Sequence, residues 1–182
     1  MIAELGEEGF YKMQKETLAA GTSCHSLIEQ CLKGTPMNDI SPGENSVKLW
    51  QSVTSVLDEV NDMIATEHKV THSYLGYSGY LDCIASYKGQ TCLIDWKTSK
   101  KPKYKLQDCY DDPVQIAAYV GAYNSSSGVK NQIVNGVVVK IYHNGKPASA
   151  FQINDFMMQF YWRKWLERLA LYHDIVSNNT NT

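Results

Sequence analysis

Hydrophobic positions in the first third of the chain recur every three or four residues, which is the spacing of α-helices. The stretches LGEEGFYKMQKETLAAG (residues 5–21) and TSCHSLIEQCLKG (residues 22–34) predict two helices, and Gly34 is typical of a helix end. A polar loop, TPMNDISPGEN, comes next. Apolar side chains between residues 46 and 65 predict a third helix, because one helical stripe holds Val47, Trp50, Val53, Val56, Leu57, Val60 and Ile64.

From Lys69 onward the pattern changes to an alternation of apolar and polar residues, which is typical of β-strands. Three consecutive strands are predicted, with the sequences KVTHSYLGY, YLDCIASY and TCLIDWK. The dipeptide Lys88-Gly89 separates the last two and favours a two-residue hairpin turn. We therefore expect an antiparallel meander in the middle of the chain.

The C-terminal half combines a helix, two strands and a long last helix. The stretch DDPVQIAAYVGAYN predicts a helix, because Asp112 before Pro113 is typical of a helix start. The strands QIVNGVVVKIY and ASAFQI follow, then an amphipathic helix from about Asp155 to Val176 and a polar tail at 177–182. This order predicts an α/β fold, in which helices flank both faces of a mixed sheet.

The chain has 182 residues, of which 43% are hydrophobic, and this fits a single domain over residues 1–182. No apolar run approaches the length of a membrane span, and no signal or transit peptide is recognisable, so we expect a soluble chain without membrane association. The net charge of −2 gives no global attraction to nucleic acid. Any polyanion must therefore meet a local patch, and one group of lysines qualifies: Lys97, Lys100, Lys101, Lys103 and Lys105.

The five cysteines are odd in number and show no C-x-x-C spacing. Most of them lie among apolar neighbours. This usage favours free, buried thiols in a reducing compartment over a disulfide framework or a zinc site.

Charged residues interrupt the apolar hairpin around Lys88-Gly89. Counting back from this turn brings Asp82 opposite Asp95 and Tyr80 opposite Lys97, unless a glycine bulge shifts the count by one. Because side chains alternate along a strand, Asp82, Asp95 and Lys97 share one face. Two opposed carboxylates at about 5 Å repel each other by roughly 3 kcal/mol at an effective dielectric constant near 20.

Two arrangements can offset this repulsion. Lys97 can form a salt bridge that holds the hairpin together, which is common in sheets. Alternatively, both carboxylates can bind a divalent cation, and oxygen ligands suit Mg²⁺ or Mn²⁺. The residues of the hairpin alone leave both explanations open.

The chain also shows a wider order of residues: a helix-borne His25, then Asp82, then Asp95-x-Lys97 after an apolar run, and finally Gln115-x-x-x-Tyr119 on the following helix. This order resembles the PD-(D/E)XK nuclease superfamily, and within it the RecB-like exonuclease branch. The resemblance implies a nuclease-like mixed sheet flanked by helices. It also implies an extra helical segment at 35–66 that roofs the active site.

The resemblance assigns roles to individual residues. Asp82 and Asp95 would ligate Mg²⁺ or Mn²⁺, together with His25 and the backbone carbonyl of Trp96. Lys97 would assist the attack of water. No iron–sulfur cluster is expected, because the cysteine spacings do not supply its signature. The remaining assignments are Gln115 as a catalytic residue and four substrate contacts, namely Lys100, Lys101, Tyr104 and Tyr119.

The activity that the resemblance implies is metal-dependent hydrolysis of single-stranded DNA from its free ends. The enzyme would act as a monomer in mitochondria, where it would process flaps or ends during replication, repair and maintenance of the genome. Base stacking on exposed rings is typical of proteins that bind single strands, and Tyr104 and Tyr110 flank the lysine patch.

Three alternatives remain open at this stage. The first is a nuclease-like module that binds nucleic acid without cleaving it, although the retention of facing carboxylates argues against it. The second is a structural domain in which Asp82, Asp95 and Lys97 form only a salt bridge and the last helix docks a partner. The third is a duplex endonuclease of the same superfamily, which usually requires a dimer.

Overall fold

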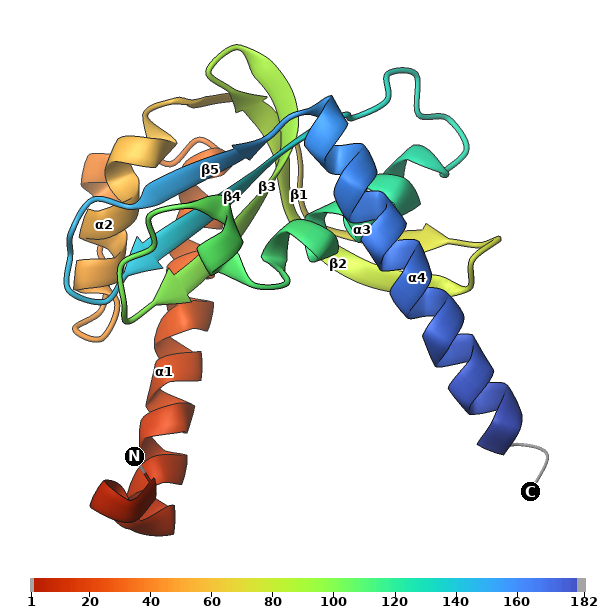
Figure 1. The fold of residues 1–182 in the computed structure, drawn as a ribbon. Coiled ribbons are helices and arrows are strands. Elements are labelled where there is room, and N and C mark those ends of the chain that lie inside the picture. Colours follow the sequence, from red (N-terminus) through yellow and green to blue (C-terminus); the bar gives the residue numbers. More distant parts are fainter. Residues whose placement is uncertain (1, 180–182) are drawn as a thin grey trace. The chain divides into compact units, whose positions relative to one another are not determined.

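The computed structural model describes residues 2–179 and contains a five-stranded sheet with helices before, between and after its strands (Figure 1). Residues 180–182 of the predicted polar tail lie outside the described residues, whereas 177–179 extend the last helix. In chain order, with η for a 3-10 helix, the elements are α1 (Ile2–Leu32), η1 (Met37–Asp39), α2 (Val47–Leu57), β1 (Val60–His72), β2 (Tyr77–Tyr87), β3 (Gln90–Ser99), η2 (Leu106–Cys109), α3 (Asp112–Asn124), β4 (Asn135–Tyr142), β5 (Ser149–Ile153) and α4 (Asp155–Asn179).

The strands follow the order β1-β2-β3-β4-β5 in a mixed sheet, which confirms the predicted α/β class. The described chain divides into two compact units. The first unit comprises 2–59, 96–102 and 140–148, and the second comprises 60–95, 103–139 and 149–179. Strands β3 and β4 each contribute residues to both units.

In the first unit, one long helix replaces the two helices predicted before Gly34. Helix α1 bends at Gly6, whose φ of 68° and ψ of 168° are not helical, and Figure 1 shows this bend near the N-terminus. The helix continues through Gly21, where the prediction placed a break, because a glycine weakens a helix interior without ending it. It packs against α2, and its buried side chains include Cys24, Leu27 and Ile28.

Helix α2 is shorter than predicted, because it ends at Leu57. Val60 and Ile64 belong to β1, so the expected helical segment at 35–66 is helical only in part. The two residues fit both a helical stripe and a strand of β-branched residues, and strand pairing decides between them. Ile64 is 57% exposed and therefore is not the core residue that the stripe predicted.

The hairpin of β2 and β3 has the predicted register. Lys88 and Gly89 both have positive φ, 51° and 78°, as a two-residue type I′ turn requires. Antiparallel pairing runs from Tyr87 with Gln90 to Cys83 with Ile94. The expectation of an unbulged turn is therefore confirmed over these pairs, whereas the preceding strand β1 begins nine residues before the predicted Lys69.

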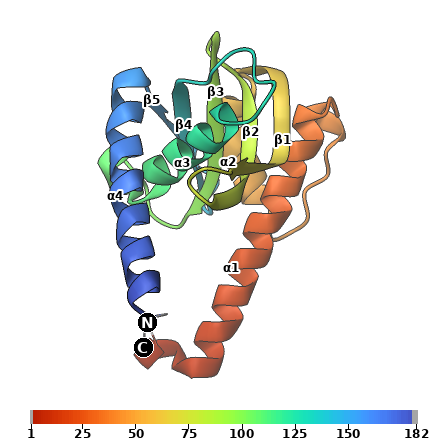
Figure 2. The same cartoon turned by 90° about the vertical axis from the view of Figure 1, so that its right-hand side faces the viewer.

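The core of the second unit combines side chains of the strands with side chains of α3 and α4, and these two helices pack against each other. The two helices lie side by side in both views (Figures 1 and 2). Gly121 of α3 allows this approach, because a Cβ there would overlap the ring of Trp162 from α4. The buried core residues of this unit include Val70, Leu81, Ile84, Leu93, Ile116, Ala117, Val120, Val138, Ile153 and Met158.

The cysteines and the helices bear on what composition predicted about thiols and membrane spans. All five cysteines are free, and four of them are buried, which confirms the prediction of free thiols. None of the helices in residues 2–179 combines the length and the apolar character needed to cross a membrane.

Candidate active site

Two of the predicted site residues, Asp82 and Asp95, lie at the end of the paired part of the hairpin. The last pair is Cys83 with Ile94, and each aspartate comes one position further along its strand. Asp95 is only 1% exposed, and Asp82 is half-buried between the fully buried Leu81 and Cys83. Two acidic side chains therefore occupy strands whose neighbouring positions form the apolar core.

A third carboxylate, from Glu67 on β1, was not predicted. The pairs Thr66 with Cys83 and His68 with Leu81 bracket it, so Glu67 lies across from Asp82 on the neighbouring strand. Carboxylate oxygens of Glu67 and Asp82 approach within 4.8 Å of each other. The sequence feature that could have revealed it is the Ser73–Gly76 turn, because counting back from this turn along β1 and β2 places Glu67 opposite Asp82.

The charges of this carboxylate pair act on a neighbouring thiol. The pKa of Cys83 is raised to about 12, chiefly by burial and further by Cys92, Asp82 and Glu67. Negative charge is therefore concentrated around Glu67 and Asp82, and a cation placed beside them is stabilised.

His25 and Trp96, which the resemblance names as metal ligands, meet inside the first unit. The Nε2 atom of the half-buried His25 lies 2.9 Å from the backbone oxygen of Trp96. When Nε2 carries a proton, it donates this hydrogen bond to the carbonyl. When Nε2 is deprotonated, its lone pair and the carbonyl oxygen are two donor atoms at a spacing that one cation can bridge.

Lys97 comes two positions after Asp95 on β3, so alternation directs both side chains to the same side of that strand. Lys97 is half-buried, whereas Lys100 and Lys101 in the following loop are exposed. The pKa of His143 is lowered by burial and by the positive charge of Lys100. The loop after β3 in the first unit is thus a region of local positive charge.

Gln115 and Tyr119 form a hydrogen-bonded pair on α3. The Nε2 atom of Gln115 donates to the Tyr119 hydroxyl over 2.9 Å. The Tyr119 ring rests on the backbone of Gly79, because a Cβ there would lie 2.5 Å from its Cε1 atom. Gly79 lies three residues before Asp82 on β2, so this contact positions the Gln115–Tyr119 pair relative to Asp82. The role of Gly79 was not predicted, because the contact is tertiary.

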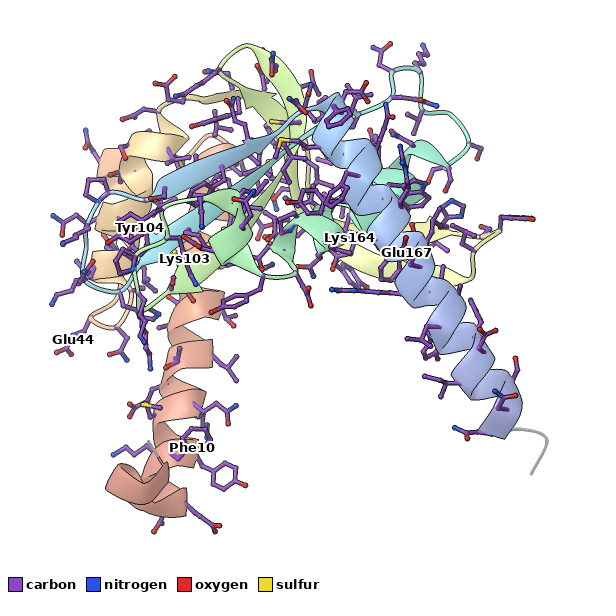
Figure 3. The ribbon with its side chains drawn as sticks, viewed as in Figure 1. Phe10, Glu44, Lys103, Tyr104, Lys164 and Glu167 are labelled. Atoms are coloured by element: carbon purple, nitrogen blue, oxygen red, sulfur yellow. The ribbon has the colours of Figure 1, made fainter. Side chains whose placement is uncertain are left out.

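Two exposed tyrosines lie on either side of η2, in the segment that follows β3. Tyr104 is 83% exposed and Tyr110 is 82% exposed, and the ammonium of Lys103 lies 4.4 Å from the centre of the Tyr110 ring. Asp108 accepts hydrogen bonds from the backbone amides of Tyr104 and Lys105, at 3.1 and 3.2 Å, which fixes this loop. Figure 3 shows Lys103 and Tyr104 on the loop that follows β3. Exposed rings next to ammonium groups suit the stacking of bases and the binding of phosphates.

The donor atoms on these strands suit a hard divalent cation. In the second unit these are the carboxylate oxygens of Glu67, Asp82 and Asp95. In the first unit, taken by itself, the carbonyl oxygen of Trp96 lies 2.9 Å from the imidazole Nε2 of His25. Oxygen-rich sets of this kind favour Mg²⁺ and Mn²⁺ over metals that prefer thiolates. The residues that are present therefore fit such a metal.

Comparison with known proteins identifies relatives of the chain. The chain is similar to mitochondrial genome maintenance exonuclease 1 of mouse (36% identity over 180 residues), human (38% over 181) and Xenopus tropicalis (37% over 172). The matches cover 98%, 98% and 94% of this chain, and 53%, 52% and 50% of the respective relatives. The chain thus spans about half the length of these curated relatives.

A sequence profile of the PD-(D/E)XK nuclease superfamily matches residues 43–171. This range contains Asp82, Asp95, Lys97, Gln115 and Tyr119. It also covers all five strands and helices α2 and α3. The chain belongs to the PD-(D/E)XK nuclease superfamily.

Proposed function

We propose that the chain is a metal-dependent exonuclease that hydrolyses phosphodiester bonds of single-stranded DNA from free ends. The observation that carries the proposal is the hairpin register, which leads to Asp82 on one strand and to Asp95-x-Lys97 on the other within a superfamily of nucleases. The names of the relatives support action on DNA ends in mitochondria. We place its role in the replication and maintenance of mitochondrial DNA, through the processing of flaps or ends.

Four residues would hold the cation, namely Asp82, Asp95, His25 and, through its backbone carbonyl, Trp96. The cation, when bound, supplies positive charge beside the scissile phosphate and lowers the pKa of a coordinated water. Burial of Asp95 supports this assignment, since a buried carboxylate requires compensating charge. The distance of 2.9 Å between His25 Nε2 and the Trp96 oxygen supports the other two ligands.

Lys97 would assist the reaction directly. Its ammonium can donate hydrogen bonds to the attacking water or to the phosphate oxygen on which negative charge increases, and such groups commonly contribute about 10²-fold or more to the rate. Gln115, held by Tyr119 at 2.9 Å, would orient the water or the phosphate. The close packing of the Tyr119 ring on Gly79 favours such a positioning role.

The substrate strand would pass over the loop after β3. Lys100 and Lys101 would contact phosphates, and Tyr104 would stack on a base. We propose a monomer, because one chain carries every residue assigned above. Light scattering at several concentrations tests this, and the mass of a dimer would contradict it.

The test is digestion of end-labelled single-stranded DNA, beside matched duplex, circular single-stranded DNA and RNA, in Mg²⁺, Mn²⁺ or EDTA. The proposal predicts shortening of linear single strands only, and only with metal, in the wild type but not in Asp82→Asn. Cleavage of the circle or the duplex would indicate an endonuclease. Binding without cleavage would indicate an inert module, and neither binding nor cleavage would indicate a structural domain.

A further inference from the structure

The carboxylate of Glu67 belongs to none of the motifs that identify the superfamily in this chain, yet it lies beside Asp82. The two residues come from different strands, β1 and β2, and their carboxylate oxygens approach within 4.8 Å. Glu67 is exposed and Asp82 is half-buried, so a hydrated cation can reach both. Like charges at this distance repel each other, and a cation between them removes that cost.

The backbone around Glu67 is fixed in an uncommon conformation. Glu67 has a φ of 46°, in the left-handed region that residues with a Cβ seldom adopt. The adjacent Thr66 donates a hydrogen bond from its hydroxyl to the backbone oxygen of Asp82, over 3.1 Å. This hydrogen bond and the flanking pairs keep Glu67 of β1 opposite Asp82 of β2.

We propose that Glu67 is a further carboxylate ligand of the divalent cation at the Asp82 site, bound directly or through one of the cation's water molecules. This inference rests on the proposed function, because that function places the cation at Asp82. The added negative charge would increase the affinity of the site for Mg²⁺ or Mn²⁺. Glu67 would thereby set the metal concentration at which the enzyme becomes active.

The test measures Mn²⁺ binding to the full chain by calorimetry and by electron paramagnetic resonance, without DNA. We expect Glu67→Gln to weaken Mn²⁺ binding by about tenfold or more, as is common when a group that supports a metal is lost. Asp62→Asn is the matched control, because Asp62 is also an exposed acid of β1 with a positive φ, 47°. This control should bind Mn²⁺ as the wild type does.

Thermal unfolding separates metal binding from a merely structural role. Without metal, the Tm of Glu67→Gln reports any structural contribution of the Glu67 charge. The rise in Tm on adding Mn²⁺ should shrink in this variant. A lower Tm without metal, together with an unchanged response to Mn²⁺, would show that Glu67 is only structural and would overturn the inference.

The outcomes also distinguish this inference from the proposed function. Wild-type chain that binds Mn²⁺ and cleaves DNA, beside a Glu67→Gln variant with unchanged Mn²⁺ affinity, would refute the role of Glu67 alone. Wild-type chain that neither binds Mn²⁺ nor cleaves DNA would refute the proposed function, and the inference with it.

Discussion

Gly79→Ala should reduce cleavage far more than stability, because of one contact between β2 and α3. A Cβ at Gly79 would lie 2.5 Å from Cε1, 3.2 Å from Cζ and 3.3 Å from the hydroxyl oxygen of Tyr119. Carbon atoms in contact are ordinarily about 3.5–4.0 Å apart, so the ring has to retreat by about 1 Å. Gln115 donates to the hydroxyl of this ring over 2.9 Å and must move with it or lose the hydrogen bond.

The expected loss of stability and the expected loss of turnover differ in size. Overpacking usually costs about 1–3 kcal/mol, and the lower end applies here because the half-buried Tyr119 ring can swing outward. We therefore expect Gly79→Ala to lower the free energy of unfolding by about 1 kcal/mol. A displacement of about 1 Å in a positioning group can reduce turnover about 10²-fold, so the loss of cleavage should be much larger.

The assay compares turnover at saturating single-stranded DNA with urea unfolding of the same preparations. Gly43→Ala is the control, because a Cβ at Gly43 meets only the Ser46 hydroxyl oxygen, at 3.9 Å. It should change neither quantity appreciably. Full turnover in Gly79→Ala would refute the reasoning, because it would mean that the position of the Tyr119 ring does not matter for the reaction.

Three further predictions concern surface and core groups. Cys83 should resist alkylation in the native chain at mildly alkaline pH, because burial and neighbouring negative charge hold its pKa near 12, and rapid labelling by mass spectrometry would contradict this. Tyr104→Ala should weaken binding of single-stranded DNA by about 1–3 kcal/mol in filter binding, whereas Tyr74→Ala, in the β1–β2 turn, should not. The exposed Asp111–Arg168 ion pair, 2.6 Å long, lowers the pKa of Asp111. The pair therefore adds at most about 1 kcal/mol to the free energy of unfolding above about pH 4, and this contribution is lost as the pH falls through the lowered pKa. Urea titrations should find Asp111→Asn and wild type equally stable at low pH. At neutral pH and low salt, the variant should be the less stable of the two.

Local patterns predicted the hairpin that positions the site. The Lys88-Gly89 dipeptide specifies its own turn, because its positive φ angles match the twist of the strands, and the register follows by counting. The predicted boundary between α2 and β1 was wrong, since Val60 and Ile64 satisfy both periodicities and only the pairing of strand β1 with β2, as of Val60 with Tyr87, decides between them.

The neighbours of the candidate site were harder to predict than its motif residues. Glu67 lies fifteen positions before Asp82, and no local pattern marks it as an opposing residue until the Ser73–Gly76 turn is placed. Gly79 looks like an ordinary strand glycine, because its contact comes from Tyr119 on a helix much later in the chain. Such features depend on tertiary packing, which single-sequence periodicity does not contain.

In the proposed mechanism, Lys97 acts in the chemical step. The most direct test of this role is a comparison of cleavage and binding of end-labelled single-stranded DNA by wild type, Lys97→Ala and Lys146→Ala, in Mg²⁺ for cleavage and in EDTA for binding. Lys146 is an exposed lysine of the same unit and serves as the matched control for lost charge. We expect that Lys97→Ala alone loses cleavage by about 10²-fold or more while it still binds DNA. Wild-type cleavage rates in Lys97→Ala would show that Lys97 has no role in the chemical step.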